Sequence, residues 1–538
     1  DDNRFRQLLW TLIEALDQGE HRGCNNHNSM NMNGRISIAA ALGHRGFLHD
    51  VLYGCERGGA WRYGLIHLLR HDFLSDGMQW EGAMGYHMRV LRIVSECLTI
   101  LEHLGVDLWQ RDWPSLNQDD GYDEHRGWGP RGGRCIKAGF EALIYQAFTS
   151  GDYSLTHDQI LGNLRGAYVW WPLFNKAYDV YGDERFAWVL RQINGGKAAK
   201  NDGTLPVWLA DGRGATLFVR VERRDHPEGT NPFTDDRDFS LTGRHVHGCS
   251  LFPVHGSAVL RSDTSDGDAL GASLYFGPHW AGHRSPAALH LDIHGRGRRV
   301  TTAPHLTKGG YGDPMHLTWV RSTLAHNTVT VDEQPMFPFD FPTDSLWECD
   351  HWRDTISDSE LVLFQPEHDH KAVRVRNDNV YKGVTLDRTV VLTDRYVLDV
   401  FRVLGQSPRQ LDWAMHCHGT FALAGEGESI DLGANRGYMH LTNARRHRPA
   451  AGWTTVDFSL DDAPGRVGLY LGLVANAQLI TAADPLPDER TPIGDRRRPE
   501  PHTCLIVRTQ SDKALFVSLW SLGDKAATGH TVTGTADG

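Results

Sequence analysis

Two short polar segments in the first half of the chain carry side chains that could perform acid–base chemistry. Asn25-Asn26-His27-Asn28 places three amides and an imidazole within four residues, which is a dense set of hydrogen-bond donors and acceptors. Residues 76–87 form the second segment, and its candidate side chains are Trp80, Glu81, Tyr86 and His87. Each segment also has a purely structural interpretation. The first could be a helix N-cap and turn, and the second could be a glycine-containing loop with Tyr86 packed at the start of a helix.

The second half of the chain holds three further segments of this kind. Gly282-His283 precedes a short apolar stretch, Tyr311-Gly312-Asp313 follows a glycine pair, and residues 321–329 read Arg-Ser-Thr-Leu-Ala-His-Asn-Thr-Val. Taken singly, a histidine at a strand end is usually a satisfied polar residue, and we predict this for His290 and His294. The order of the segments along the chain carries more information than any one of them.

Helices must position the first set of residues. Before residue 240, apolar side chains recur at helical spacing in segments separated by Gly-, Pro- and Asp-rich connections. We expect helices at 5–16, from near Gly34 to 42, 65–69, 89–104 closed by Gly105, 138–148 and 169–180. Helix pairs joined by such loops are typical of an (α/α) toroid or a bundle.

Strands must position the second set. After residue 240 the apolar stretches become short, β-branched and bounded by turn residues. We expect strands within 257–260, 272–276, 328–331, 373–376, 390–403, 467–474 and 505–519. Strands without intervening helices imply antiparallel sheets stacked as a sandwich. The predicted fold is therefore an α+β multidomain chain, with an (α/α) toroid over 1–240, whose N-terminal completeness is left open, and an antiparallel β-sandwich region over 241–538.

Composition excludes several classes of function. The net charge of −12 argues against nucleic acid and membrane surfaces as partners, although an acidic protein can still hold a local cationic cleft. Eight cysteines occur without a C-x-x-C pair, so they predict neither a zinc knuckle nor a disulfide framework. The chain begins without a basic and apolar leader. We expect a secreted or periplasmic protein whose signal has been removed; its oligomeric state is left open.

The order of the polar segments resembles the heparinase II/III-like polysaccharide lyases, a family that includes lyases for heparin, alginate and related uronate polymers. The matching pieces are Asn-Asn-His at 25–27, Asp-Gly-x-x-x-Glu-Gly-x-x-Gly-Tyr at 76–86, Gly-His at 282–283, Tyr-Gly-Asp-Pro at 311–314 and Arg-Ser-Thr-x-Ala-His-Asn-Thr-Val at 321–329. The stretches 387–390, 399–401 and 412–416 are also similar. The resemblance covers about residues 20 to 420, and its most specific piece is 321–329.

The chain departs from this family at the residues that hold a metal. The family commonly has Gly-His-x-His-x-Asp and a later Asp, which bind a metal together with the His of the His-Asn-Thr segment. Here the corresponding positions read His283-Arg284-Ser285-Pro286-Ala287 and Ala303, so His326 is the one surviving ligand. Losing two or three ligands should abolish a tetrahedral site. We therefore expect no cofactor and a lost or relocated metal, with His305, His316, Asp292 and His294 as weak substitutes.

The resemblance implies β-elimination on an acidic polysaccharide. This reaction removes the C5 proton beside the uronate carboxylate, where negative charge then develops and needs hydrogen-bond donors. The resemblance gives that role to Asn26 and His27. Tyr86 is the leading acid, and could act as both acid and base, while His27 or Tyr311 is the candidate base for a proton on the other face.

The remaining site residues are assigned to alignment and substrate binding. His283 aligns catalytic groups or substrate; Asn25, Trp80, Glu81 and Arg321 contact the substrate. Cationic residues that could meet its charge are Arg35, Arg62, Arg126, Arg321 and Arg374. Because the motifs come from both halves of the chain, we expect the cleft between the toroid and the sandwich.

Two rival functions stay open at this point. An (α/α)-toroid glycoside hydrolase would need two carboxylates flanking the scissile bond, for which Glu81 with Asp76 or Asp123 with Glu124 are candidates. A non-catalytic polysaccharide-binding protein is the second rival, made plausible by the eroded metal site. The presence together of Asn26, His27, Tyr86 and Tyr311 argues against pure binding.

Overall fold

Two compact units make up the chain, and each is described here by itself. The computed structural model describes residues 2–18, 26–57, 60–114, 132–133, 136–157, 163–164, 171–193, 205–206, 220–221, 227–262, 269–277, 283, 285–304, 313–336, 359–367, 369–423, 425–448, 452–460, 463–470, 474, 476–485 and 502–522. The first unit comprises 1–145, 164–232 and 238–244, and the second comprises 146–163, 233–237 and 245–538. The division into domains at residue 240 stays a prediction, and the segment 146–163 groups with the later residues.

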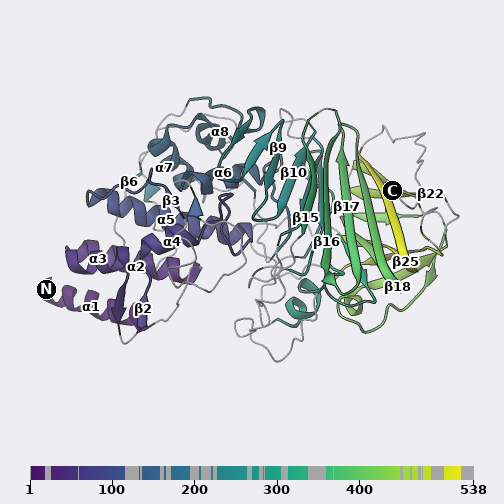
Figure 1. Ribbon diagram of the computed structural model, residues 1–538, viewed down its shortest axis with the longest axis horizontal. Helices are drawn as coiled ribbons and strands as arrows, with labels where there is room; N and C mark the ends of the chain where they lie inside the picture. The colour runs from purple at the N-terminus through teal and green to yellow at the C-terminus, as the bar shows by residue number, and fades with distance from the viewer. Residues whose placement is uncertain are drawn as a thin grey trace. The chain divides into compact units, whose positions relative to one another are not determined.

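Helices dominate the first unit (Figure 1). They are α1 (Asp2–Gln18), α2 (Asn26–Leu42), α3 (Arg45–Tyr53), α4 (Leu65–His71), α5 (Met84–His103), α6 (Lys137–Tyr145), α7 (Trp171–Tyr181) and α8 (Glu184–Ile193). Short two-stranded pairings accompany them: β1 (Cys55–Arg57) with β2 (Ala60–Arg62), β3 (Trp113–Pro114) with β4 (Gly132–Gly133), and β5 (Leu205–Pro206) with β6 (Arg220–Val221). No helix in the described ranges has the length and apolar character needed to cross a bilayer.

The amphipathic helix predicted at 89–104 is confirmed as α5, which begins five residues earlier. One face of α5 is buried along its whole length, including Met88, Leu91 and Leu98. Gly105 follows with φ +82°, a left-handed conformation that glycine adopts without a Cβ penalty. The apolar periodicity therefore gave the helix and its end, and Tyr86 stands in its first turn.

The predicted start of the second helix was wrong. We expected it near Gly34, but α2 begins at Asn26. Gly34 lies inside α2, and its missing side chain leaves room for α1. A Cβ on Gly34 would be 3.0 Å from Leu16 Cδ1. The Asn-His pair therefore belongs to the first helical turn rather than to a loop before it.

Antiparallel sheets form the later part of the chain. A seven-stranded sheet has the order β13-β12-β11-β10-β9-β8-β7, and a twelve-stranded sheet follows the path β15-β16-β17-β18-β25-β23-β22-β19 with β14, β20, β21 and β24 branching from it. The first sheet's strands are β7 (Arg237–Asp238), β8 (Arg244–Val246), β9 (Cys249–Phe252), β10 (Ser257–Arg261), β11 (Gly271–Tyr275), β12 (His290–Gly295) and β13 (Arg298–Arg299).

The larger sheet contains the longest strands, and β15 to β18 and β25 are seen side by side in Figure 1. Its members are β14 (Val329–Val331), β15 (Glu360–Gln365), β16 (Lys371–Tyr381), β17 (Val384–Leu392), β18 (Tyr396–His418), β19 (Thr420–Ala422), β20 (Glu428–Ser429), β21 (Thr442–His447), β22 (Trp453–Leu460), β23 (Ala463–Tyr470), β24 (Gln478–Ala483) and β25 (His502–Leu522). The single stretch predicted at 390–403 is a hairpin, because Thr393 Oγ1 accepts the N–H groups of Arg395 and Tyr396 and turns the chain.

One apolar core is shared by the two sheets. It includes Leu274 and Leu291 from the smaller sheet together with Phe401, Trp413 and Trp520 from the larger. Period-two alternation places these side chains on one face of each strand. The mixed helical and antiparallel architecture predicted from the sequence is thus present.

Candidate active site

The first turn of α2 is held by a carboxylate from a distant loop. Glu81 Oε2 accepts the backbone N–H of Asn26 at 3.2 Å, which satisfies one of the donors that a helix start leaves open. A negative charge at this end also interacts favourably with the helix dipole. Asn26 is buried, whereas His27 beside it is exposed. Asn26 and His27, the two residues predicted to bind the substrate carboxylate, therefore lie in a first turn of α2 that is held in place by Glu81.

A second buried carboxyl group lies behind Glu81. Gln79 Nε2 donates to Glu81 Oε2 at 3.0 Å and to Asp72 Oδ1 at 3.0 Å, so one amide bridges the two acidic groups. Ser29 Oγ of α2 donates to Asp72 Oδ2 at 3.5 Å. Burial raises the pKa of Asp72 to about 7, although its hydrogen bond from Gln79 acts in the opposite direction. The loop thus contacts α2 at two points.

The same loop is fastened to the start of α5. The backbone N–H of Gln79 donates to His87 Nδ1 at 2.9 Å, so the proton of this imidazole is on Nε2, which donates to Gly139 O at 2.9 Å. Burial lowers the pKa of His87 to about 4, in keeping with a neutral ring. Tyr86, the residue before it, is half-buried. The Arg89 guanidinium carbon lies 5.7 Å from the centre of the Tyr86 ring and places a cation beside the phenol.

Gly77 allows this loop to pass close to α6. Its φ of +87° lies in the left-handed region, and a Cβ there would be 2.5 Å from the carbonyl oxygen of Ala138. Any side chain at this position would push the loop away from α6. The Asp-Gly pair at 76–77 is therefore required for the loop to fit.

Among the sequence candidates of the first unit, the structure brings Asn26, His27 and Tyr86 onto two helix starts joined by one loop. Glu81 is only 2% exposed and bonded to protein groups, so its place differs from the substrate contact predicted for it. Trp80 is half-buried. Asn25 lies outside the described residues.

Sequence reasoning missed Asp72 and Gln79, both of which are fully buried. Asp72 precedes the motif 76–86 and Gln79 stands at one of its variable positions, so neither gave a spacing signal of its own. The available hint was that polar residues in a loop between two apolar helices must find partners if that loop is buried.

The candidates of the second unit have mixed positions. His283 is buried with 3% exposure, and Arg321 is buried with its Nε donating to His316 Nε2 at 3.3 Å. Arg321 directly follows a π-helical turn, His316–Val320, a rare geometry that often occurs at functional sites. Tyr311 and His305 lie outside the described residues.

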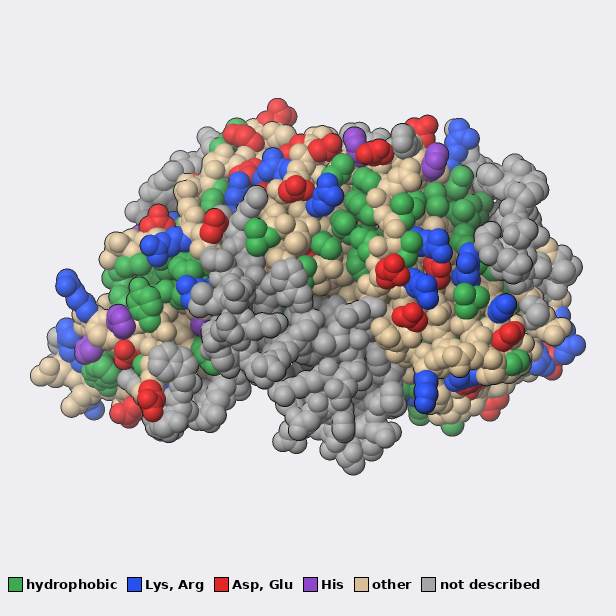
Figure 2. Space-filling view, in the orientation of Figure 1, with side chains coloured by type: hydrophobic (Ala, Val, Ile, Leu, Met, Phe, Trp, Pro, Cys, Tyr) green, Lys and Arg blue, Asp and Glu red, His purple; other side chains and the backbone are tan. Residues whose placement is uncertain are grey.

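The other cationic candidates have varied surroundings. Arg374 forms a two-bond pair with Asp387, at 2.9 and 2.6 Å, and Arg35 is buried in α2. Arg62 is half-buried, and Arg126 falls outside the described residues, as do Asp123 and Glu124. On the face in Figure 2, acidic and basic side chains are interspersed over the second unit.

The Arg-Ser-Thr-Leu-Ala-His-Asn-Thr-Val segment has a structural centre in Asn327. Its Nδ2 donates to the carbonyl groups of Leu291 at 2.9 Å and Thr302 at 3.1 Å, and its Oδ1 accepts the N–H of His416 at 2.7 Å. Arg388, paired at 2.7 and 2.8 Å with Asp399, donates to the Asn327 carbonyl as well. This segment therefore joins the two sheets.

The residues around His326 do not fit the metal that the resemblance implies. His326 Nδ1 donates to the Ser322 carbonyl at 2.9 Å, and its buried Nε2 has no hydrogen-bond partner among the described residues. The nearby ring of His290 uses both nitrogens, with Asn327 N–H at 3.0 Å and Asp292 at 3.1 Å. One free ligand nitrogen does not make a tetrahedral site.

The proposed substitute ligands are bound to protein groups too. Asp292 accepts from Ser154 Oγ and Leu155 N at 2.6 Å each, and His294 Nε2 lies 2.9 Å from Ser150 Oγ and 3.0 Å from Asp152. His316 accepts from Arg321. The expectation that His290 and His294 are hydrogen-bonded at a strand is confirmed for both.

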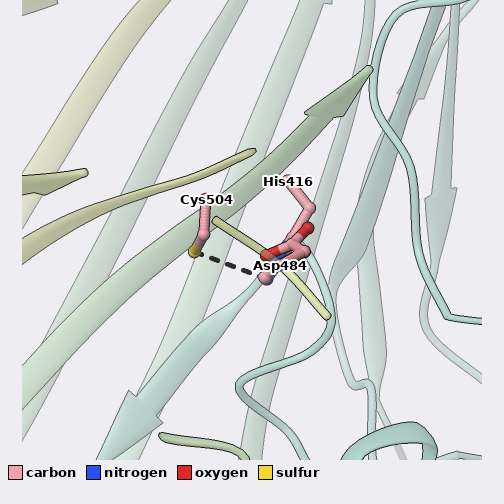
Figure 3. Close-up of side chains that lie close together, drawn as sticks. All are labelled: His416, Asp484 and Cys504. Carbon is pink, nitrogen blue, oxygen red and sulfur yellow. Dashed lines mark hydrogen bonds and ion pairs between the residues drawn. The ribbon is translucent and has the colours of Figure 1, made fainter. Parts of the chain in front are cut away.

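A separate group of possible ligands, His416, Asp484 and Cys504, is drawn in Figure 3. His416 Nδ1 lies 3.0 Å from both Asp484 oxygens, and its Nε2 lies 2.7 Å from the Leu324 carbonyl, which can only accept. Burial lowers the pKa of His416, but the Asp484 carboxylate outweighs it and raises that pKa well above the ordinary value. Both ring nitrogens therefore carry protons, and this cluster is a buried ion pair rather than a ligand set.

Parts of the chain are similar in sequence to known proteins. Residues 250–469 match the family described as "Heparinase II/III-like, C-terminal". An alginate lyase of Stenotrophomonas maltophilia is 26% identical over 292 residues, which cover 52% of this chain and 36% of that protein. An exo-oligoalginate lyase of Saccharophagus degradans is 24% identical over 223 residues, covering 35% of this chain and 29% of that one.

Solved structures of similar fold extend over nearly the whole chain. A heparinase III superposes with a TM-score of 0.59 at 14% identity, covering 95% of this chain and 61% of that chain. A heparan sulfate lyase of Pedobacter heparinus gives 0.56 at 14% identity, covering 96% and 63%. The chain thus spans less than two thirds of these relatives. The resemblance found in the sequence is confirmed: residues 250–469 match the heparinase II/III-like C-terminal family, and the fold is similar to that of a heparinase III.

Proposed function

We propose that this chain is a polysaccharide lyase that cleaves a uronate-containing polymer by β-elimination. The observation that carries the proposal is the joining of the Asn26–His27 helix start to the Tyr86 helix start through Glu81 and Gln79. Amide, imidazole and phenol are the groups that the reaction requires. The relatives named as alginate lyases and heparinases support the same chemistry.

In the proposed mechanism, Asn26 and His27 donate hydrogen bonds to the uronate carboxylate. Negative charge grows on this carboxylate as the C5 proton leaves, so donors fixed in advance lower the barrier. Elimination then breaks the bond to the 4-linked oxygen and leaves a double bond between C4 and C5. The fixed start of α2 supports this role, because it removes reorganisation from the reaction.

Tyr86 is proposed as the acid that protonates the leaving oxygen. Tyr86 is also proposed as the base when the C5 proton lies on that face, and the Arg89 guanidinium group lies over its ring. For a proton on the opposite face, His27 or Tyr311 is the proposed base. His283 is assigned to alignment, and Asn25, Trp80 and Arg321 to substrate contact, on the strength of the resemblance.

The fold that we propose in finer detail is an (α/α) toroid for the helices and a β-sandwich for the two sheets with their common core. The proposed substrate is an acidic polysaccharide, either alginate or a glycosaminoglycan such as hyaluronan, chondroitin or heparin and heparan. We propose a secreted or periplasmic location, which agrees with a polysaccharide substrate. No metal takes part in the proposed chemistry.

The burial of Glu81 and Asp76 argues against this pair as the carboxylates of the hydrolase alternative, whereas its other pair, Asp123 with Glu124, lies outside the described residues. Glu81 is bonded to Asn26 and Gln79, and Asp76 is fully buried with its Oδ1 3.3 Å from the Met78 N–H. Carboxyl groups held in this way are poorly placed to flank a glycosidic bond. A binding protein without turnover would have no need for a phenol beside a guanidinium group.

The test is incubation of the protein with a panel of uronate polymers while ultraviolet absorbance is followed. The conjugated double bond of a lyase product absorbs, so we expect absorbance to rise with alginate or with at least one glycosaminoglycan. New reducing ends without absorbance would favour the hydrolase. Binding without either signal would favour the non-catalytic protein.

A further inference from the structure

The side chain of Gln79 has every polar group engaged in a fully buried site. Its Nε2 bridges Asp72 and Glu81, and its Oε1 accepts the Glu81 N–H at 3.1 Å. Its backbone N–H meets His87. A buried amide with all of these bonds satisfied is rigid, and removing it would leave several polar groups without partners.

The bonds of Gln79 run in two directions. Toward α2 the Gln79 side chain holds Glu81, whose Oε2 also accepts the N–H of Asn26. Toward α5 the Gln79 backbone N–H holds His87, which is anchored in turn to Gly139 at the start of α6. Asn26 and Tyr86 are thus separated along the chain by sixty residues but lie on helix starts that are both bonded to Gln79, one through its side chain and the other through its backbone.

The amide of Gln79 also reduces the repulsion between Asp72 and Glu81. Asp72 and Glu81 are both buried, and the proximity of Glu81 raises the pKa of Asp72 in addition to the effect of burial. An amide N–H between two carboxyl oxygens offsets their repulsion. Without it the carboxyl groups would move apart, and Glu81 would carry the start of α2 with it.

We propose that Gln79 is a positioning residue that sets the placement of Asn26 and His27 relative to Tyr86. This inference rests on the proposed lyase function, and it assigns to Gln79 no contact with the substrate. A displacement of about 1 Å between catalytic groups can lower a rate by roughly a hundredfold, so the effect should appear in turnover.

The experiment compares Gln79→Ala with wild type in steady-state lyase kinetics on the best polymer of the panel. We expect kcat to fall by roughly a hundredfold while KM changes by less than about threefold, because the donors remain present but are misplaced. Hydrogen–deuterium exchange of the same protein should become faster in the first turn of α2, because the substitution removes the side-chain bonds to Glu81 and Asp72, and stay unchanged in β17 and β18. Gln110→Ala, which alters an exposed glutamine of the same unit, is the matched control.

Each result decides between the possibilities. A folded Gln79→Ala variant with wild-type kcat, or with a rise in KM alone, overturns the positioning role while leaving the lyase function intact. Should Gln79→Ala fail to fold, Gln79→Asn takes its place, because it keeps the amide but cannot span both carboxyl groups, and the same loss of kcat is expected. A wild-type protein that yields no unsaturated product refutes the lyase function and this inference together.

Discussion

The imidazole of His87 accepts the backbone N–H of Gln79 at 2.9 Å, and this bond fastens the helix turn that carries Tyr86 to the loop beneath Asn26. The phenol is therefore held by its neighbour in sequence rather than by contacts of its own ring alone. This arrangement makes the role of the Tyr86 hydroxyl testable without disturbing the backbone.

Tyr86→Phe should remove nearly all turnover and leave the fold intact. The substitution deletes only the hydroxyl of a half-buried ring, so thermal stability should change little, while proton transfer typically contributes 100- to 10,000-fold. The measurement is the initial rate of absorbance increase together with the melting temperature. Tyr53→Phe, at a ring that is 58% exposed, should behave as wild type. Full activity of Tyr86→Phe would reject the acid assignment.

Asn327→Ala should destabilise the second unit by at least about 3 kcal/mol, because it leaves two carbonyl groups and one N–H of the core without their partner. Urea unfolding monitored by tryptophan fluorescence would measure the change in free energy. Asn435→Ala is the matched control, since its exposed side chain donates one bond, to Glu333, which keeps its ion pair with Arg508, and its effect should stay within about 1 kcal/mol. Equal stability of the two variants would show that Asn327 does not join the sheets.

The contribution of Glu96 to the stability of the protein should fall as pH rises from about 5 to about 8. Burial raises the pKa of Glu96 to about 8, whereas an unfolded glutamate has a pKa of about 4.3. Within that window the folded state keeps a proton that the unfolded state has lost, so each such group lowers the free energy of unfolding by at most about 1.4 kcal/mol per pH unit. Above pH 8 this contribution becomes constant.

Glu96→Gln should make that pH slope shallower, because an amide of the same shape does not titrate. Its partner Asn33 remains available on α2. Glu102→Gln alters an exposed residue of the same helix that pairs with Lys176, and it should retain the wild-type slope. Urea unfolding at several pH values provides the comparison. A slope unaffected by Glu96→Gln would show that this carboxyl group is charged in the folded protein.

Treatment with a chelator should leave the melting temperature unchanged. At two positions where the family has metal ligands this chain has Ser285 and Ala303, and both nitrogens of His416 are bonded to protein groups. A metal that binds only the folded state would stabilise it, and its removal would lower the melting temperature. A large decrease, reversed by a divalent cation, would show that a metal is bound.

Sequence periodicity predicted most helices and strands because each of them buries one face. It failed at Asn26, where the helix start depends on a carboxylate fifty-five positions away, and at residues 393–395, where a threonine side chain turns an apolar stretch back on itself. The motif residues Asn26, His27 and Tyr86 could be found from the resemblance. Gln79 could not, because its importance comes from four hydrogen bonds to three residues that meet only in three dimensions.

The most direct test of the lyase mechanism is digestion of the preferred polymer in heavy-oxygen water, with the products weighed by mass spectrometry. Elimination adds no water, so we expect each cleavage to give one unsaturated end that is lighter by one water molecule than the hydrolytic end and contains no heavy oxygen at C4. Cleaved products that all lack this loss of one water molecule would contradict β-elimination and identify a hydrolase.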